Sequence, residues 1–138
     1  MSVTQIFVNL PVDDIDKSKA FYEALGFPLN PQFSDETSGY VVISDTIAVQ
    51  LATRDKFREF TNRDVPGGGG AISALGVESR DEVDRLADTA LLSGGSPTKE
   101  PTDFGWLYNR GFADPDGHCY EVVFLDPSAM PDDPNAPT

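Results

Sequence analysis

QIFVNLPVDDIDKSKAFYEALG, residues 5–26, predicts a β-strand followed directly by an α-helix. Apolar residues alternate with others along Gln5 to Val12, which is the period of a strand with one buried face. Asp14 can cap the first turn of the helix, and Gly26 supplies its end. The first half of the chain therefore begins with a βα unit.

Two short runs rich in β-branched residues come next, and they indicate a hairpin. They are Tyr40 to Ser44 and Ile47 to Ala52, joined by Asp45-Thr46. A further strand is expected around Leu29 to Phe33. The stretch from Arg54 to Gly70 changes to charged residues and ends in four consecutive glycines, so we expect a flexible linker there, with its Gly-rich part at 61–70.

The same order of elements repeats after the linker. Ala71 to Val77 is expected to form a strand. Ser79 and Glu82 have the spacing of a capping box, which marks the start of a second helix. Gly94-Gly95 marks the end of that helix.

A second hairpin is clearer than the first. Trp106 to Ala113 and His118 to Phe124 flank the turn Asp114-Pro115-Asp116-Gly117, whose proline presets φ and whose glycine tolerates positive φ. Both halves thus share the order strand, helix, strands. We predict an α+β fold of two βαβββ modules, about 5–57 and 71–125, in one domain (1–125), followed by an acidic, proline-rich tail (126–138).

Composition excludes several classes of function. The 138 residues suit one domain, and no run approaches the roughly 18 apolar residues of a membrane span. Ten Lys and Arg against 23 Asp and Glu give a net charge of −13, which repels phosphate backbones and anionic lipids. The single cysteine, Cys119, and an N-terminus without signal-peptide character predict a cytoplasmic protein.

Several short motifs, in their order along the chain, resemble the vicinal oxygen chelate superfamily. That superfamily includes glyoxalase I, extradiol dioxygenases, fosfomycin-inactivating thiol transferases and bleomycin-binding resistance proteins. The motifs are Val12-Asp13-Asp14-Ile15-Asp16-Lys17-Ser18, Ala20-Phe21-Tyr22, Leu25-Gly26-Phe27, and Asp114-Pro115-Asp116-Gly117-His118 running into Glu121. The likeness covers nearly everything from Gln5 to Pro127.

A narrower resemblance is to a bacterial subgroup usually labelled predicted lactoylglutathione lyase. It rests on Ile6–Val12, Asn30–Phe33 and Phe104–Tyr108. The resemblance implies a glyoxalase-like fold, in which the sheets of the two modules curl into an open barrel with the helices outside. It also implies that the concave cup of that barrel is the functional site.

In metal-dependent members of the superfamily, His, Glu or Gln residues at four strand positions hold a divalent ion. Aligned on those positions, this chain has Phe7, Gln50, Ile72 and Glu121. Phe7 and Ile72 have no lone pair, so the set falls short of the three protein ligands typical of catalytic zinc. We therefore expect no cofactor at these degenerate positions, although a divalent metal stays open if a partner chain supplies ligands.

Glu121 is the candidate catalytic residue. In an apolar cup, desolvation would disfavour its charged form and suit it to act as a general base or as an anchor for a ligand. The alternative is a buried polar residue tied to Gln50 or Asn9. The resemblance places Phe7, Gln50 and Ile72 in the cup, and strand parity adds Asn9, Leu107 and Asn109. We predict these six as the ligand-binding residues.

Other chemically suggestive residues have plainer interpretations. His118, the only histidine, directly follows the turn and is expected to serve the turn or the start of the strand. Cys119 has no clear activating base, so we expect a small buried residue. The opposite strand parity places Trp106, Tyr108, Arg110 and Phe112 under the helices, where Arg110 needs a salt bridge or a surface position.

Two functions compete on this basis. The first is a metal-deficient protein that binds a small apolar or aromatic molecule, related to the bleomycin-binding proteins. The second, implied by the subgroup's label, is a glyoxalase-type lyase or isomerase that uses Glu121 as its base. An extradiol dioxygenase is a weaker alternative, because its iron needs two histidines. A pure interaction module is the third class. The resemblance implies a homodimer, whereas the net charge and composition predict no nucleic-acid or membrane partner.

Overall fold

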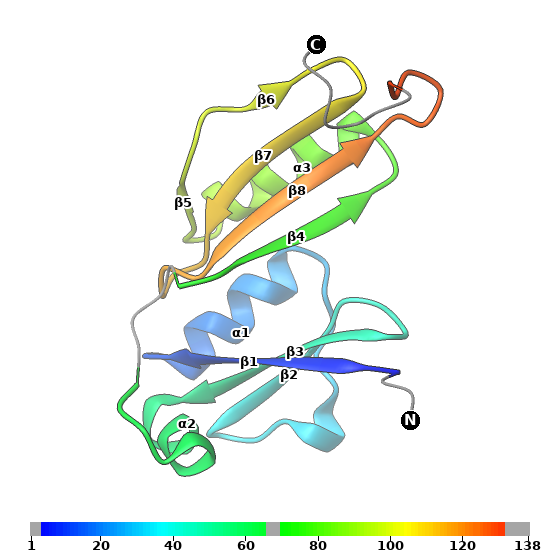
Figure 1. Ribbon diagram of the computed structural model, residues 1–138. Helices are drawn as coiled ribbons and strands as arrows, with labels where there is room; N and C mark the ends of the chain where they lie inside the picture. Colours follow the sequence, from blue (N-terminus) through cyan, green and yellow to red (C-terminus); the bar gives the residue numbers. More distant parts are fainter. Residues whose placement is uncertain (1–3, 66–69, 132–138) are drawn as a thin grey trace. The chain divides into compact units, whose positions relative to one another are not determined.

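The computed structural model describes residues 4–65 and 70–131, and the chain divides into two units. Unit 1 comprises residues 1–68 and 115–117, and unit 2 comprises residues 69–114 and 118–138. The elements of each unit are labelled in Figure 1. None of the helices in the described ranges has the length and apolar character that a membrane crossing requires.

Unit 1 contains a three-stranded sheet and two α-helices (Figure 1). In the sheet, β3 is central, with β1 parallel to it on one side and β2 antiparallel on the other. The elements are β1 (Ile6–Val12), α1 (Ile15–Ala24), the 3-10 helix η1 (Pro31–Phe33), β2 (Ser38–Val42), β3 (Ile47–Thr53) and α2 (Arg54–Thr61).

Local signals set both ends of α1 as the sequence predicts. The Asp14 side chain accepts a hydrogen bond from the Lys17 backbone N–H at 3.1 Å. Gly26 follows the helix with φ +95°, a conformation that glycine adopts without steric penalty. Phe21 and Tyr22 of α1 are buried, since the helix packs against β2 and β3.

The alternation in the strands of unit 1 produces two distinct sheet faces. One face forms the core under α1 with Val12, Val41 and Leu51, all almost fully buried. Because successive side chains point to opposite faces, the residues between them project from the other face. The site described below lies on that second face.

Two expectations for unit 1 are wrong. Residues 54–61, expected as linker, form α2, because the Thr53 side chain caps the Lys56 N–H at 3.3 Å and Asn62 ends the helix with φ 54°. The strand expected around Leu29 to Phe33 is a single bridge between Leu29 and Val41 followed by η1. Four linker residues, 66–69, and tail residues 132–138 lie outside the described residues.

Unit 2 contains one α-helix against a sheet with the order β4-β8-β7-β5, in which β6 also pairs with β7. Strands β4 and β8 are parallel, and the β7–β8 pair is antiparallel. The elements are β4 (Ile72–Val77), α3 (Arg80–Leu92), β5 (Ser96–Pro97), β6 (Thr102–Asp103), β7 (Leu107–Ala113) and β8 (Cys119–Leu125). The predicted α+β class, with a helix-and-sheet unit in each half, is confirmed.

The capping box and the turn that the sequence predicts in unit 2 are also present. Ser79 Oγ accepts from the Glu82 N–H at 3.1 Å, while the Glu82 carboxylate accepts from the Glu78 N–H at 2.9 Å. At the hairpin, the Asp114 N–H donates to the His118 carbonyl and Asp114 Oδ1 accepts from the His118 N–H, both at 2.9 Å. These bonds fix where α3 and β8 begin.

Candidate functional site

The open face of the unit 1 sheet brings together three of the predicted ligand-binding residues. Asn9 on β1 pairs in register with Gln50 on β3, and Gln50 pairs with Tyr40 on β2. Residues in register project from the same face of a sheet, and so does Phe7, two residues before Asn9. A row of polar and aromatic side chains therefore crosses all three strands.

Aromatic rings dominate this face. The ring centroids of Phe7 and Tyr40 are 6.1 Å apart with planes tilted by 49°, and those of Phe33 and Tyr40 are 5.5 Å apart with a tilt of 45°. Phe33 comes from η1, which is tied to β2 because the Tyr40 N–H donates to Ser34 Oγ at 2.9 Å. Tyr40 is thus the middle ring of three.

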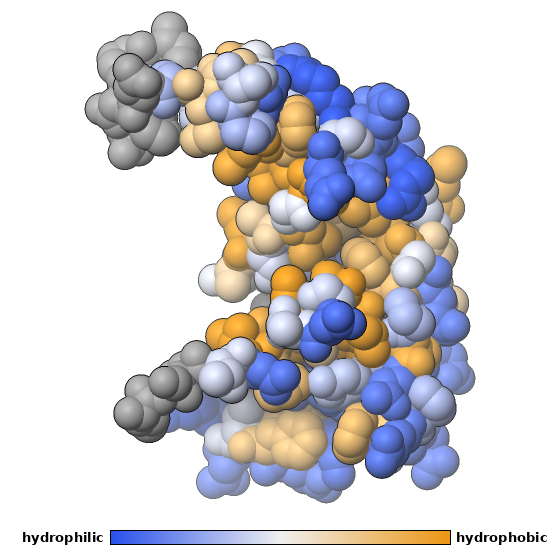
Figure 2. Space-filling view, turned by 90° about the vertical axis from the view of Figure 1, so that its right-hand side faces the viewer, coloured by the Kyte–Doolittle hydropathy of each residue, from blue (hydrophilic) through white to orange (hydrophobic). Residues whose placement is uncertain are grey.

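These side chains line a pocket of about 530 Å³, here called the aromatic pocket. Its lining residues are Phe7, Asn9, Phe33, Tyr40 and Gln50. Phe7 is 48% exposed and Phe33 55%, so the rings are available to a ligand. Figure 2 shows that hydrophobic residues reach the surface among hydrophilic ones on the face in view.

The polar groups of the aromatic pocket are uncharged. Asn9 Nδ2 donates to the Phe7 backbone carbonyl at 3.2 Å. That bond fixes the orientation of the amide, because the flipped orientation would set two oxygens against each other. Asn9 Oδ1 is consequently available as a hydrogen-bond acceptor.

Sequence reasoning missed Phe33 and Tyr40. The predicted two-residue turn Asp45-Thr46 would pair Tyr40 with Leu51 and turn its ring to the opposite face, whereas the structure pairs Tyr40 with Gln50, one residue away from that register. Phe33 had no signal either, because it stands in a 3-10 turn that was expected to be a strand. A residue outside a strand has no parity from which its direction can be predicted.

The remaining predicted residues share one face of the unit 2 sheet. Glu121 on β8 pairs with Ala74 on β4 and with Gly111 on β7, and Ile72 pairs with Cys119. Leu107 and Asn109 have the same parity on β7. Ile72 is 64% exposed, whereas Asn109 is only 8% exposed.

Glu121 has a partner that the sequence did not indicate. Lys99 Nζ lies 3.4 Å from Glu121 Oε1, and the same ammonium donates to Thr102 Oγ1 at 3.1 Å. The partners that the sequence suggested for Glu121, Gln50 and Asn9, belong to unit 1. Lys99 belongs to unit 2, as Glu121 does. The carboxylate is half-buried and pairs with an opposite charge.

Gly111 explains how Lys99 reaches Glu121. A Cβ at Gly111 would collide with Thr98 Oγ1 and would approach Lys99 Cγ to 3.3 Å. The connection between β5 and β6 runs along the edge of β7 with which both strands pair, and its Thr98 and Lys99 side chains lie over Gly111, where β7 has no side chain. Because Gly111 is the register partner of Glu121, the Lys99 side chain reaches that carboxylate.

Asn109 is an unexplained polar group on the same face. Its Oδ1 is buried, and no hydrogen-bond donor reaches it among the described residues. Its register partner on β6 is Thr102, the hydroxyl of which accepts from Lys99. Buried polar atoms are nearly always paired, so this oxygen is an open acceptor for a water or a ligand.

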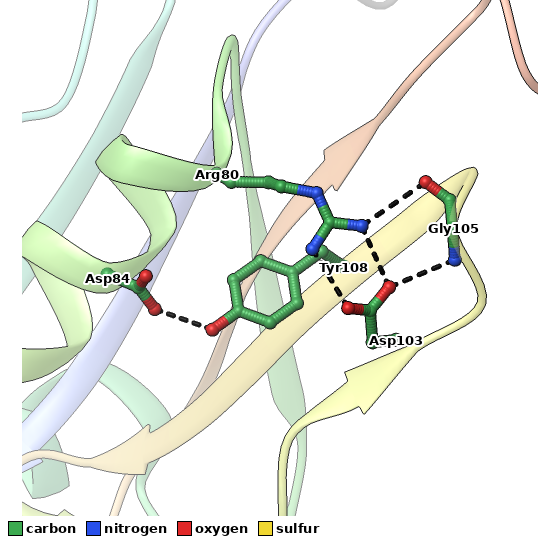
Figure 3. A network of polar contacts seen from close by, with 5 residues as sticks. All are labelled: Arg80, Asp84, Asp103, Gly105 and Tyr108. Carbon is green, nitrogen blue, oxygen red and sulfur yellow. Dashed lines mark hydrogen bonds and ion pairs between the residues drawn. The ribbon is translucent and has the colours of Figure 1, made fainter.

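The opposite face of the same sheet is structural. Arg110 pairs with Asp84 at 3.2 Å and Asp88 at 2.8 Å on α3, which is the salt bridge the sequence requires of it. Figure 3 shows the adjoining network, in which Tyr108 donates to Asp84 at 2.6 Å. There Arg80 holds Asp103 through two hydrogen bonds, at 2.8 and 2.9 Å, and lies over the Tyr108 ring.

This network is also electrostatically tuned. The hydrogen bonds from Arg80 lower the pKa of Asp103 to about 2, from an ordinary value of 3.8. The pKa of Tyr108 is raised, chiefly by its hydrogen bond to the Asp84 carboxylate. Both shifts favour the hydrogen-bonded forms seen in Figure 3, so the network fastens α3 to β6 and β7 and holds no free reactive group.

His118 and Cys119 lie at the start of β8. His118 is 9% exposed and its backbone closes the turn with Asp114, which fits the expected turn or strand-start role. Cys119 is half-buried, opposite Ile72. Neither residue belongs to the aromatic pocket.

The residues at the family's metal-ligand positions do not fit a divalent ion. Phe7 and Ile72 offer only hydrocarbon, and the Glu121 carboxylate already holds an ammonium. Over residues 4–65 and 70–131, no three His, Cys, Asp or Glu side chains come close enough to share a metal. We derive no chemistry through a metal here.

Known proteins are similar to this chain in fold and, over part of its length, match it in sequence. Residues 4–44 match the family model described as bleomycin resistance protein-like N-terminal. The hypothetical protein SA1046 from S. aureus is 30% identical, with 91% of this chain and 96% of that chain covered and a TM-score of 0.77. None of the curated proteins matches the sequence significantly.

Two more distant structures show the fold alone. A glyoxalase/bleomycin resistance protein/dioxygenase family enzyme from Burkholderia phytofirmans PsJN is 18% identical, over 86% of this chain and 96% of that chain, with a TM-score of 0.74. A lactoylglutathione lyase from Agrobacterium tumefaciens is 18% identical, over 90% of this chain and 95% of that chain, with a TM-score of 0.65.

Proposed function

The chain belongs to the vicinal oxygen chelate superfamily, and we propose that it binds a small apolar or aromatic molecule in the aromatic pocket of unit 1. The observation that carries this proposal is the convergence of Phe7, Tyr40 and Phe33 on one hollow of about 530 Å³. Small-molecule sites are typically about 300–1,000 Å³, mostly apolar, with a few placed polar groups.

The polar groups give the pocket its selectivity. Asn9 and Gln50 flank the rings with amides, and no ionised side chain lines the pocket. Burial of apolar ligand surface on the rings provides the affinity, at roughly 25 cal/mol per Å². A ligand with a group that hydrogen-bonds to these amides should bind more tightly than one without it, because an amide that the ligand covers without a hydrogen bond loses its contact with water.

A titration of the full chain with indole, followed by ¹H–¹⁵N NMR, tests this function. We expect shifts concentrated on β1, β2, β3 and η1. Phe33→Ala should weaken binding about tenfold, since a lost aromatic contact is worth roughly 1 kcal/mol or more. Phe60→Ala is the matched control, because Phe60 is similarly exposed, at 58%, but lies outside the pocket. Equal losses in both variants, or no shifts at all, would contradict the proposal.

The second candidate is a glyoxalase-type lyase or isomerase, and the Lys99–Glu121 pair favours it. Glu121 would accept a proton from substrate, while the Lys99 ammonium would stabilise negative charge developing on a substrate oxygen. The test is formation of thioester from the hemithioacetal of methylglyoxal and glutathione. Turnover that disappears in both Glu121→Gln and Lys99→Met, but survives in the surface variant Glu100→Gln, would establish this candidate.

A further inference from the structure

We infer that the ligand of the aromatic pocket carries a positive charge, as an alkylammonium or quaternary ammonium group. This inference rests on the proposed function and adds the chemical class of the ligand. Three observations support it: the arrangement of the rings, the absence of a competing cation, and the nature of the polar groups around them.

The three rings provide a multi-sided π surface. Tyr40 stands between Phe7 and Phe33, at centroid distances of 6.1 and 5.5 Å, and neither neighbour is parallel to it. A cation within about 6 Å of a ring centroid is attracted by the negative face of the ring. Since all three rings line the same hollow, a guest the size of a trimethylammonium group can contact more than one of them.

No cation of the chain already uses these rings. Elsewhere, Lys56 lies over Phe60 at 5.5 Å and Arg80 lies over Tyr108 at 4.9 Å. Over Phe7, Phe33 and Tyr40 no Lys or Arg lies among the residues that the structure describes, and none lines the pocket. The strongest polar interaction that these ring faces can make is therefore left for a ligand.

The polar surroundings include a hydrogen-bond acceptor in the pocket and a carboxylate in a neighbouring hollow. One N–H of the Asn9 amide donates to the Phe7 carbonyl, and the amide oxygen remains an acceptor. A second hollow of about 300 Å³ shares Phe7 and Tyr40 with the aromatic pocket and includes the Asp45 carboxylate. The net charge of −13 concentrates cations around the whole chain and disfavours anions.

The experiment compares two ligands of nearly equal shape by NMR titration of the full chain. Phenyltrimethylammonium is the cation, and 2-phenyl-2-propanol is its neutral counterpart. We expect the cation to bind about tenfold more tightly, which is the fold-change that a cation–π contribution of about 1.4 kcal/mol gives. Phe33→Leu and Tyr40→Leu should each reduce this preference several-fold, whereas Phe60→Leu should leave it unchanged.

The outcomes separate the two proposals. If indole and the neutral compound bind but the cation does not bind more tightly, the inference of a charged ligand is wrong and the proposed function stands. If the preference for the cation persists unchanged in Phe33→Leu and Tyr40→Leu, the cation binds to the acidic surface and the inference is again wrong. If indole and both compounds leave the spectrum unchanged, the proposed function fails with it.

Discussion

The Lys99 ammonium lies 3.4 Å from Oε1 of Glu121, the carboxylate at the last of the family's metal-ligand positions. The same ammonium is hydrogen-bonded to Thr102, so it is held from two sides. A divalent ion at Glu121 would have to displace this lysine, and Ile72 on the same sheet face would offer it only hydrocarbon. The Glu121 carboxylate is thus already paired with a cation of its own unit.

Metal titration tests this relationship. Protein stripped with a chelator should show no tight one-to-one binding of nickel, zinc, manganese or ferrous ions by calorimetry, because fewer than three suitable ligands converge. Glu121→Gln should behave as the unaltered chain does. Tight binding that is lost in Glu121→Gln would show that Lys99 yields to a metal and that the ligand alignment is wrong.

Gly111→Ala should destabilise the chain by about 1–3 kcal/mol, because the new methyl group collides with Thr98 of the β5–β6 connection. Urea unfolding measures the loss. Gly76→Ala is the matched control, since a Cβ on that β4 residue meets nothing within 4 Å. Equal losses of stability at both positions would mean that Thr98 moves away from the new methyl group at little cost.

Asn109→Leu should leave the free energy of unfolding unchanged or raise it. The substitution removes a buried oxygen that makes no hydrogen bond among the described residues and keeps the branching and the number of heavy atoms of the side chain. Asn30→Ala is the contrasting variant, because Asn30 Oδ1 accepts a hydrogen bond from the Gln32 N–H at 2.9 Å. This variant should lower the free energy of unfolding by about 1 kcal/mol. A loss above about 1 kcal/mol in Asn109→Leu would reveal a bound partner for that oxygen.

Stability should fall between pH 3.8 and about 2 as Asp103 is protonated. Its pKa is depressed in the folded chain, so its contribution is fully present above the unfolded value of 3.8 and is lost as the pH falls through about 2. Asp103→Asn should therefore reduce the change of the urea-unfolding midpoint with pH over this window, and Arg80→Met should have the same effect. Glu100→Gln, an exposed substitution outside the Arg80–Asp103 network, should not change the slope.

Interactions between neighbouring residues determined where the helices and the late hairpin begin and end. Asp14 and Ser79 cap their helices where the sequence places them, and the turn at 114–117 joins the two strands it was expected to join. Strand parity also placed Asn9 on the face of Phe7, because alternation is a property of each strand by itself. Helix α2 was missed because its eight residues mix charges and phenylalanines next to a glycine run.

Tertiary pairing decided the site. Tyr40 meets Phe7 because β2 and β1 both pair with β3 in a particular register, and Phe33 joins them from a turn that has no strand parity. Lys99 reaches Glu121 because the β5–β6 connection places the lysine side chain over Gly111, where β7 has no side chain. The sequence alone determined where elements begin and which way their side chains alternate, since those depend on neighbouring residues. Which rings and charges meet depends on strand register and loop path, and these follow from packing over the whole unit.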